Sequence, residues 1–242
     1  MTDWSHRRIA VTGAGGGIGA EISAGLARLG AQVIALDLHQ PVGLPASVRT
    51  GVLDVTSEQA VTDLVHKLYD SDTTAVDLVN CAGIVENDIA AEDMSTAQFD
   101  AVLSVNLRGV FLCCREFGRQ LLARGGGSIV NISSMSGNHV VNHPQRQCAY
   151  NTSKAGVSAL TRSLAAEWGA SGVRVNAVAP GYVDTPLNSL KPDKHERWLA
   201  DTVLGRFAQP AEVFGAVRYL LSDEASFCCG TELLIDGGFS LR

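Results

Sequence analysis

The chain has 242 residues, 46% of them hydrophobic, and a formal net charge of −6 at pH 7. This length suits one α/β domain with a substantial core, and the negative charge argues against nucleic acid or an anionic membrane as a partner. No uninterrupted apolar run reaches membrane-spanning length and residues 1–8 lack a signal-peptide core, so we expect a cytosolic protein. The six cysteines show no Cys-x-x-Cys pattern and the six histidines are scattered, which predicts no metal site.

The first predicted elements are a strand, a glycine-rich turn and a helix. Residues 8–12 (RIAVT) read as a short, mainly apolar strand, residues 13–19 read GAGGGIG, and a helical pattern of apolar residues then runs to Gly30. Glycine lets the backbone approach a pyrophosphate closely, and a helix N-terminus favours its negative charge. The turn therefore predicts a dinucleotide site built on Gly13, Gly17 and Gly19, although a flexible loop gives similar letters.

A second predicted strand, residues 32–36, leads into Asp37. An acidic residue at this place can accept hydrogen bonds from both hydroxyls of the adenosine ribose, and it repels a 2′-phosphate. Leu38 and His39 follow, and no Arg or Lys lies inside the glycine turn. We therefore predict NAD rather than NADP as the cofactor; the alternative is that Asp37 is only a turn residue at a strand end.

The rest of the chain alternates short apolar strands with helical stretches. Further strands are expected at 48–55, 76–80, 128–133, 173–178 and 232–236, and helices at roughly 57–69, 96–124, 149–170 and 210–222. Strands that are apolar on both faces are typical of buried parallel sheets. The pattern predicts a Rossmann-type α/β fold, a doubly wound seven-stranded parallel sheet with helices on both faces.

We find no internal repeat and no interdomain linker, so residues 1–242 are expected to form one domain. The long irregular segment 184–209 contains Pro186 and Pro192 among many polar residues. This composition predicts a partly helical lid over the substrate, and the alternative is a surface loop without a role.

Tyr150 and Lys154 lie four residues apart, which places both side chains on one face of a helix. An ammonium about 4 Å from the phenol, at an effective dielectric of about 20, favours the phenolate by roughly 4 kcal/mol. That energy corresponds to about 3 pK units, so the pair predicts a tyrosine able to exchange a proton with a hydroxyl near neutral pH. Taken alone, the same spacing is also typical of a solvated helix face.

Ligands of such sheets bind beyond the carboxyl ends of the strands, and polar or small residues follow several of the predicted strands. These residues are Thr12 and Gly13, Asp37, Asp54 and Val55, Asn80 to Gly83, Ser133 and Ser134, and Pro180 and Gly181. All of them are expected at one edge of the sheet.

These motifs together resemble the short-chain dehydrogenase/reductase family in its NAD-type branch. The matching stretches are residues 12–19 (TGAGGGIG), 80–83 (NCAG), Asn106, 131–134 (NISS), Tyr150-x-x-x-Lys154 and 180–185 (PGYVDT). They cover nearly the whole chain in the order and approximate spacing of that family. The residues from Ser134 to Gln145 further resemble the polyol dehydrogenases of the family.

The resemblance implies four catalytic residues. Tyr150 is expected to be the acid/base, with Lys154 lowering its pKa and hydrogen-bonding the nicotinamide ribose. Ser134 is expected to donate to the substrate oxygen, although Ser136 is an alternative. Asn106 is expected at a main-chain kink that holds a water extending the proton path from Lys154; otherwise it is a capped or solvent-facing Asn.

The resemblance also implies the cofactor contacts. Ile18 is expected under the pyrophosphate, Asp54 and Val55 around the adenine, and Val183 and Thr185 at the carboxamide. The remaining predicted contacts are Leu38, Asn80, Ala82, Gly83, Pro180 and Gly181.

Several polar residues near Ser134 and Tyr150 are candidate partners of substrate hydroxyls: Ser136, Asn142, His143, Gln147 and Tyr182. A site built to bond hydroxyls rejects analogues that lack them, which favours a polyol or sugar alcohol. Arg146 is either a surface residue or a partner for an acidic substrate. The alternatives are a carrier-linked 3-oxoacyl reductase and a non-catalytic NAD-binding regulator. The resemblance also implies a homo-oligomer, which we predict to be a tetramer.

Overall fold

The computed structural model describes residues 2–70, 74–189 and 192–242. Seven parallel strands form one sheet in the order β3-β2-β1-β4-β5-β6-β7. Their bounds are β1 (Arg8–Thr12), β2 (Gln32–Asp37), β3 (Arg49–Val52), β4 (Val76–Asn80), β5 (Gly127–Ile132), β6 (Val173–Pro180) and β7 (Glu232–Ile235). The order reverses between β1 and β4, as in a doubly wound sheet, and confirms the predicted fold class.

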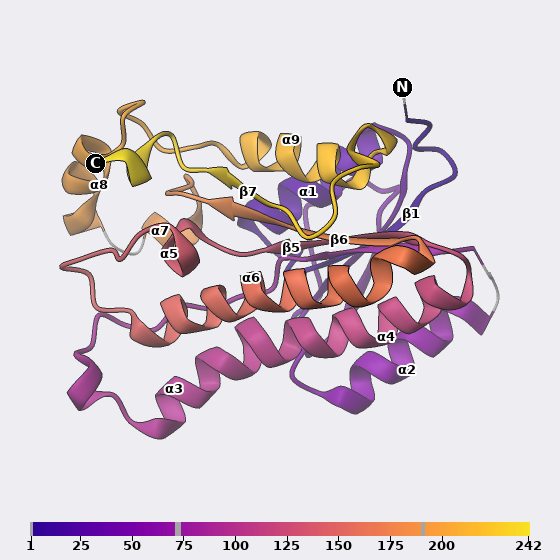
Figure 1. The fold of residues 1–242 in the computed structure, drawn as a ribbon, viewed down its shortest axis with the longest axis horizontal. Coiled ribbons are helices and arrows are strands. Elements are labelled where there is room, and N and C mark those ends of the chain that lie inside the picture. The colour runs from indigo at the N-terminus through magenta and orange to yellow at the C-terminus, as the bar shows by residue number, and fades with distance from the viewer. Residues whose placement is uncertain (1, 71–73, 190–191) are drawn as a thin grey trace.

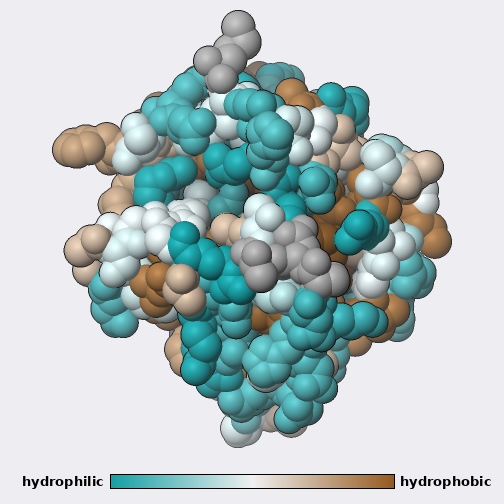
Figure 2. Space-filling view, turned by 90° about the vertical axis from the view of Figure 1, so that its right-hand side faces the viewer, coloured by the Kyte–Doolittle hydropathy of each residue, from teal (hydrophilic) through white to brown (hydrophobic). Residues whose placement is uncertain are grey.

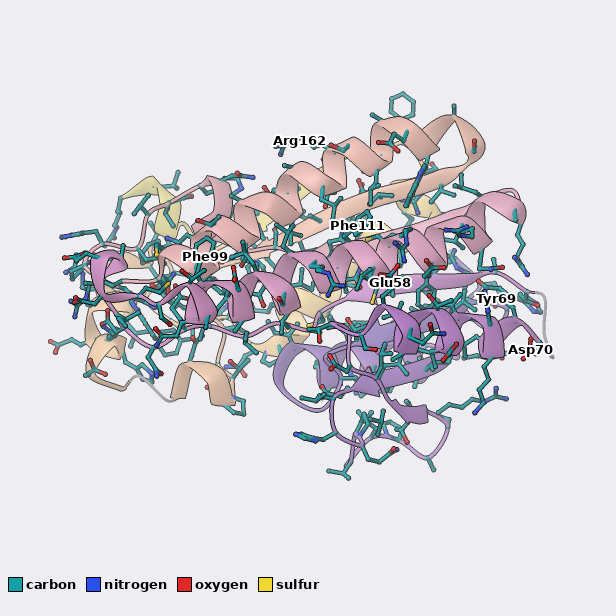
Figure 3. All side chains as sticks on the ribbon, turned by 90° about the horizontal axis from the view of Figure 1, so that it is seen from below. Glu58, Tyr69, Asp70, Phe99, Phe111 and Arg162 are labelled. Carbon is teal, nitrogen blue, oxygen red and sulfur yellow. The ribbon has the colours of Figure 1, made fainter. Side chains whose placement is uncertain are left out.

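Helices cover both faces of this sheet (Figure 1). One layer holds α2 (Glu58–Asp70), α3 (Thr96–Leu103), α4 (Val110–Ala123) and α6 (Cys148–Trp168), and the other holds α1 (Gly17–Arg28) and α9 (Pro210–Leu221). Figure 3 shows α2, α4 and α6 side by side on the first face, with Glu58, Phe111 and Arg162 on them. The short helices α5 (Met135–Asn138), α7 (Pro186–Ser189) and α8 (His195–Asp201) lie at the end of the molecule opposite the amino ends of the strands.

Each face of the sheet has its own apolar core. Phe117 and Val157 belong to the core under α4 and α6, and Ile22 and Leu220 belong to the core under α1 and α9. The central strands β1 and β4 are buried along their whole length. The expectation that every strand is buried on both faces is wrong for β3, which is largely exposed because it is the edge strand.

The predicted helix 96–124 contains a π-helical segment, Ser104–Gly109, between α3 and α4. The continuous helix Thr96–Ala123 is long and apolar enough to cross a membrane. The core helix of a globular protein passes the same test of length and composition. Its residues Phe117 and Leu121 are fully buried against the sheet.

The two ends of the sheet differ in character. Hydrophilic side chains cover most of the face at the amino ends of the strands (Figure 2). At the carboxyl ends, the segment that we predicted as partly helical contains α7, a 3₁₀ turn (Pro192–Lys194) and α8. Helix α7 and the loops after β1 to β6 line a cavity at this end.

Candidate active site

The glycine turn brings the end of β1 against the loop after β4. Gly13 has φ +69°, and a Cβ on it would lie 2.5 Å from the Ala82 nitrogen. A Cβ on Gly19 would lie 2.1 Å from the Gly13 carbonyl oxygen. Neither position has room for a side chain, and helix α1 begins directly beyond the turn. The turn thus has the close packing and the helix N-terminus that a pyrophosphate site requires.

Asp37 lies beside this turn at the end of β2. Its Oδ2 accepts a hydrogen bond from the Gly15 backbone N–H at 2.8 Å. A Cβ on Gly15 would come within 2.9 Å of the same oxygen, so glycine is needed for this approach. Among the described residues that line the cavity, Lys154 is the sole Lys or Arg. Apart from Lys154, the ionisable nitrogen side chain in the described lining is that of His39, which follows Asp37 and Leu38 in the chain.

The loop after β4 is held by Thr12, whose Oγ1 accepts hydrogen bonds from the N–H groups of Cys81 (3.2 Å) and Ala82 (3.3 Å). Ala82 and Gly83 line the cavity as predicted. Asn80 differs from the prediction, because its buried amide donates to Asn131 Oδ1 at 2.9 Å and does not line the cavity. Its place on a central strand turns the side chain toward β5, where it joins the two strands.

The predicted catalytic residues converge at the ends of β5 and α6. Tyr150 and Lys154 share one face of α6, and the Lys154 Nζ lies 5.7 Å from the centroid of the Tyr150 ring. That Nζ donates to the Ile132 carbonyl oxygen at 2.8 Å. Ser134, the N-cap residue of α5, lies near enough to Tyr150 to lower the pKa of its phenol, and its Oγ accepts a hydrogen bond from the Ser136 N–H at 3.1 Å. Ser136 lines the same cavity, and the assignment of Ser134 as the partner of the substrate oxygen stays a prediction.

The predicted lowering of the Tyr150 pKa by Lys154 is wrong for this arrangement. Burial raises the pKa of the Tyr150 phenol; the hydrogen bond with Ser134 opposes that rise and the negative charge of Glu86 adds to it. Lys154 is buried as well, which lowers its own pKa to about 8. Spacing on a helix predicted that the two groups are neighbours, whereas the loss of solvent around both decides the direction of their pKa shifts.

Asn106 lies at the π-helical segment and is fully buried. Its Oδ1 accepts from the Ile84 N–H and its Nδ2 donates to the Ile84 carbonyl oxygen, both at 2.8 Å. The Nδ2 also donates to Ser153 Oγ at 3.0 Å. The alternative of a solvent-facing Asn is wrong, and the kink with its water that the family resemblance implies stays a prediction at this π-helical segment. Asn106 joins the loop after β4 to α6 and does not itself line the cavity.

Glu86 is a residue at this site that the sequence did not suggest. Its carboxylate accepts hydrogen bonds from the backbone N–H groups of Ala149 at 2.9 Å and of Tyr150 at 3.1 Å. These groups lie in the first turn of α6, where backbone N–H groups have no partner within the helix. The N-cap residue Gln147 makes no such bond with its side chain. A carboxylate from a distant loop thus caps the helix that carries Tyr150, and no local sequence signal marks such a contact.

One cavity of about 520 Å³ joins these groups. Every predicted cofactor residue except Asn80 lines it: Gly13, Gly17, Ile18, Gly19, Asp37, Leu38, Asp54, Val55, Ala82, Gly83, Tyr150, Lys154, Pro180, Gly181, Val183 and Thr185. Apolar lining residues that the sequence did not suggest are Leu53, Ile84, Val85, Val105, Met135 and Pro186. These side chains come from loops and short helical segments whose proximity depends on the tertiary fold.

The other end of the cavity is lined by uncharged polar side chains. Ser134, Ser136, Asn142, Gln147 and Tyr182 are among them, as predicted, whereas His143 is not. The Nδ2 of Asn142 donates to the Tyr182 hydroxyl at 3.0 Å. The Oδ1 of Asn142 is buried without a hydrogen-bond partner. A buried polar atom that lacks a partner inside a cavity is suited to accept a hydrogen bond from a ligand.

Aromatic packing connects this end of the cavity to the segment 184–209. The rings of Tyr182 and Trp198 are stacked with their centroids 4.1 Å apart, and His195 packs edge-on against Phe207. Trp198 belongs to α8, so the wall that holds Tyr182 includes the segment predicted as a lid. The side chain of Tyr182 is thereby fixed between Asn142 and α8.

Comparisons with known proteins agree with this geometry. A family model described as "Enoyl-(Acyl carrier protein) reductase" matches residues 13–240. Galactitol 2-dehydrogenase of Rhizobium johnstonii is 43% identical over 246 residues, covering 96% of this chain and 95% of that protein. NADP-dependent mannitol dehydrogenase of Hypocrea jecorina is 35% identical over 251 residues, covering 97% and 92%.

The fold of this chain also matches that of a solved structure. The ligand-free aldohexose dehydrogenase of Thermoplasma acidophilum superposes with a TM-score of 0.90 at 32% identity, covering 100% of this chain and 97% of that one. The family match and the relatives span nearly the whole chain, including the glycine turn and the Tyr150–Lys154 pair. This chain therefore belongs to the short-chain dehydrogenase/reductase family, whose members are oxidoreductases that use a nicotinamide cofactor.

Proposed function

We propose that this protein is an NAD-dependent dehydrogenase that oxidises a secondary hydroxyl of a small, neutral polyol to a ketone. One observation carries the proposal. A single cavity holds the glycine turn and Asp37 at one end and, at the other, Ser134 and Tyr150 beside the unpartnered Oδ1 of Asn142. The first end suits a dinucleotide, and the second suits a substrate with several hydroxyls.

The residues present fit a nicotinamide dinucleotide. The positions of Gly13 and Gly19 exclude side chains from the turn, and Asp54 and Val55 line the same end of the cavity. NAD⁺ supplies the acceptor for the hydride when it is bound. The proposal assigns the pyrophosphate to the glycine turn and Ile18, and the nicotinamide to the end lined by Val183 and Thr185.

NAD is proposed over NADP because of Asp37. Its carboxylate lies over the turn, 2.8 Å from the Gly15 nitrogen, in a place suited to the adenosine ribose. Leu38, which follows it, is exposed and offers no charge to a 2′-phosphate. The NADP-dependent mannitol dehydrogenase among the relatives makes this proposal worth a direct test.

Tyr150 is the group assigned to accept the substrate proton. In alcohol oxidation, the phenolate oxygen accepts the proton of the substrate hydroxyl, while Ser134 hydrogen-bonds the same substrate oxygen and orients it. Lys154 contributes a cation near the phenol, held by the Ile132 carbonyl. Asn106 keeps the loop after β4 against α6 through its bonds to Ile84 and Ser153, which fixes the position of the catalytic helix.

The carrier-linked 3-oxoacyl reductase remains the second candidate, because a 3-oxoacyl-[acyl-carrier-protein] reductase of Thermotoga maritima is 37% identical to this chain over 238 residues. Asp37 argues against it, since that role usually goes with NADPH and a basic docking surface, whereas this chain has a net charge of −6. A non-catalytic NAD-binding regulator is less well supported, because such a protein has no need to keep Ser134, Tyr150 and Lys154 together.

The proposal extends to assembly and location. Phe111 on α4 remains partly exposed on the outer face of the helical layer (Figure 3), which is consistent with a homo-oligomer, proposed as a tetramer. A concentration-independent monomer in light scattering contradicts that assembly. The proposed location is the cytoplasm, where NAD is available to the enzyme.

The test is NAD⁺ reduction, followed at 340 nm, with a panel of alditols and simple secondary alcohols. The expected result is turnover with one or more alditols and little with mono-alcohols, because the latter leave the polar groups of the cavity unpaired. Binding of NAD⁺ without turnover of any alcohol or ketone supports the regulator. Preference for NADPH and a 3-oxoacyl thioester supports the carrier-linked reductase.

A further inference from the structure

The substrate end of the cavity offers hydrogen bonds but no charge. The lining side chains of the described chain at this end include Ser134, Ser136, Asn142, Gln145, Gln147 and Asn188. The cation of the lining, Lys154, has its Nζ bound to the Ile132 carbonyl oxygen. Lys154 is assigned to Tyr150 and the cofactor, so an anionic substrate group at this end has no counter-ion of its own among the described lining residues, and burying an unpaired charge is strongly unfavourable.

Two cations nevertheless belong to chain segments whose neighbouring residues line the cavity. Arg146 stands between the lining residues Gln145 and Gln147, and Lys194 lies in the turn after α7, whose Asn188 lines the cavity. Neither cation lines the cavity itself. They are nonetheless close enough in the chain to serve a carboxylate bound at the rim, provided that their side chains are available.

Both cations are held by one carboxylate. Asp88, in the loop after β4, accepts hydrogen bonds through Oδ1 from the Arg146 backbone N–H at 3.0 Å and from its Nε at 3.2 Å. The Oδ2 of Asp88 pairs with the Lys194 ammonium. These bonds lower the pKa of Asp88 to about 2, so its carboxylate stays ionised at any working pH.

We propose that Asp88 is a specificity-determining residue that selects uncharged polyols over sugar acids of the same configuration. A substrate carboxylate at the rim has to compete with Asp88 for Arg146 and Lys194, whereas an alditol hydroxyl needs neither cation. The inference rests on the proposed function, because it concerns how that same site chooses among polyhydroxy substrates.

Asp88 also holds three segments together, and the test must separate this structural effect from the effect of its charge. It ties together the loop after β4, the residues before α6 and the segment that leads into α8. Loss of this tie loosens the rim for every substrate and changes the rates for neutral and acidic substrates alike. Loss of the charge changes only the ratio between them, because it frees two cations.

The experiment compares Asp88→Asn with the wild type on a matched pair, galactitol and galactonate, in which a carboxylate replaces one terminal CH₂OH. The expected result is a rise of about fivefold or more in the ratio of kcat/KM for galactonate to that for galactitol. Raising the salt concentration to about 0.5 M is expected to reverse much of this rise, because salt screens exposed charges. If galactitol is a poor substrate, the best alditol of the panel and its aldonate take its place.

Two further variants assign the effect. Asp88→Asn combined with Lys194→Gln removes one freed cation while the tie stays broken, and the ratio is expected to return toward the wild-type value. Asp193→Asn changes a neighbouring exposed carboxylate in the turn that carries Lys194 and is expected to leave the ratio unchanged. If Asp88→Asn does not fold, as judged by its thermal melting, Asp88→Ser serves as the same test.

An unchanged ratio in a folded, active Asp88→Asn overturns the inference and leaves the proposed function standing. Loss of turnover on both substrates in the folded variant also overturns it, because Asp88 then serves catalysis as a whole. A wild-type enzyme that oxidises no alditol overturns the proposed function, and the inference falls with it.

Discussion

The two ends of the cavity are built from different parts of the protein. At the cofactor end, the site consists mainly of backbone atoms, because Gly13 and Gly19 leave no room for a side chain and α1 presents its N-terminus. At the substrate end, side chains such as Asn142, Gln147 and Tyr182 come from loops and depend on one another for their positions. A backbone site accepts one kind of ligand, whereas a side-chain site changes its substrate when a few residues change.

This comparison predicts that changes at the two ends affect different kinetic constants. Changes at the cofactor end alter the choice of dinucleotide, and changes at the substrate end alter the KM for the polyol. Tyr150 lies between the two ends, so its loss is expected to abolish turnover while both ligands still bind.

The largest expected effect is that of Tyr150→Phe. Without the hydroxyl, no group in the cavity takes the substrate proton in its place, and kcat is expected to fall by about 10³-fold. The dissociation constant for NADH, measured by fluorescence titration, is expected to stay within about twofold of the wild-type value, since the cofactor contacts remain. Tyr219→Phe, at an exposed tyrosine of α9, is the matched control. Substantial residual turnover in Tyr150→Phe is incompatible with the assigned acid/base.

The next effect concerns Asp37→Ala at the cofactor end. Loss of the carboxylate removes its hydrogen bonds to the ribose and its repulsion of a 2′-phosphate. The ratio of kcat/KM for NADH to that for NADPH is expected to fall about tenfold or more, with the KM for the polyol little changed. Asp63→Asn on α2 is a control at another exposed carboxylate. A wild type that prefers NADPH already refutes the assignment of Asp37.

A smaller effect is expected at the substrate end from Asn142→Ala. The unpartnered Oδ1 is assigned to a substrate hydroxyl, and its loss is expected to raise the KM for the polyol by up to about tenfold. The KM for NAD⁺ is expected to stay constant, because Asn142 lies outside the predicted cofactor contacts. Steady-state kinetics with each ligand varied in turn measures both constants, and Asn87→Ala, at an exposed position, is the control. Equal changes in both constants argue against separate ends.

The smallest effect is a shift in pH dependence caused by Glu86→Gln. The pKa of Tyr150 is raised by burial and further by the charge of Glu86, so alcohol oxidation is expected to speed up as the pH rises. Glutamine keeps an acceptor for the N–H groups of α6 but removes the charge. The rising limb of kcat/KM for oxidation is therefore expected to move to lower pH by a fraction of a unit. A shift to higher pH contradicts this, and Glu92→Gln is the exposed control.

The sequence by itself determined the local parts of this protein. Short runs that are apolar on both faces predicted the seven strands, and helical patterns predicted the long helices, since each pattern reflects which faces of an element are buried. The glycine turn and the spacing of Tyr150 and Lys154 predicted their own places in the cavity lining, because residues close in the chain keep their relative places in a strand–turn–helix unit or on one helix face. The other predicted lining residues followed from the family resemblance.

Only the tertiary structure decided the contacts between distant segments. Asn80 turned toward Asn131 in place of the cavity, and Glu86 reached the first turn of α6 from a loop more than sixty residues earlier. Burial also reversed the expected pKa shift of Tyr150, because the solvation of a group depends on everything that surrounds it. Such contacts and burial arise from the packing of the whole chain, and no stretch of sequence contains both partners.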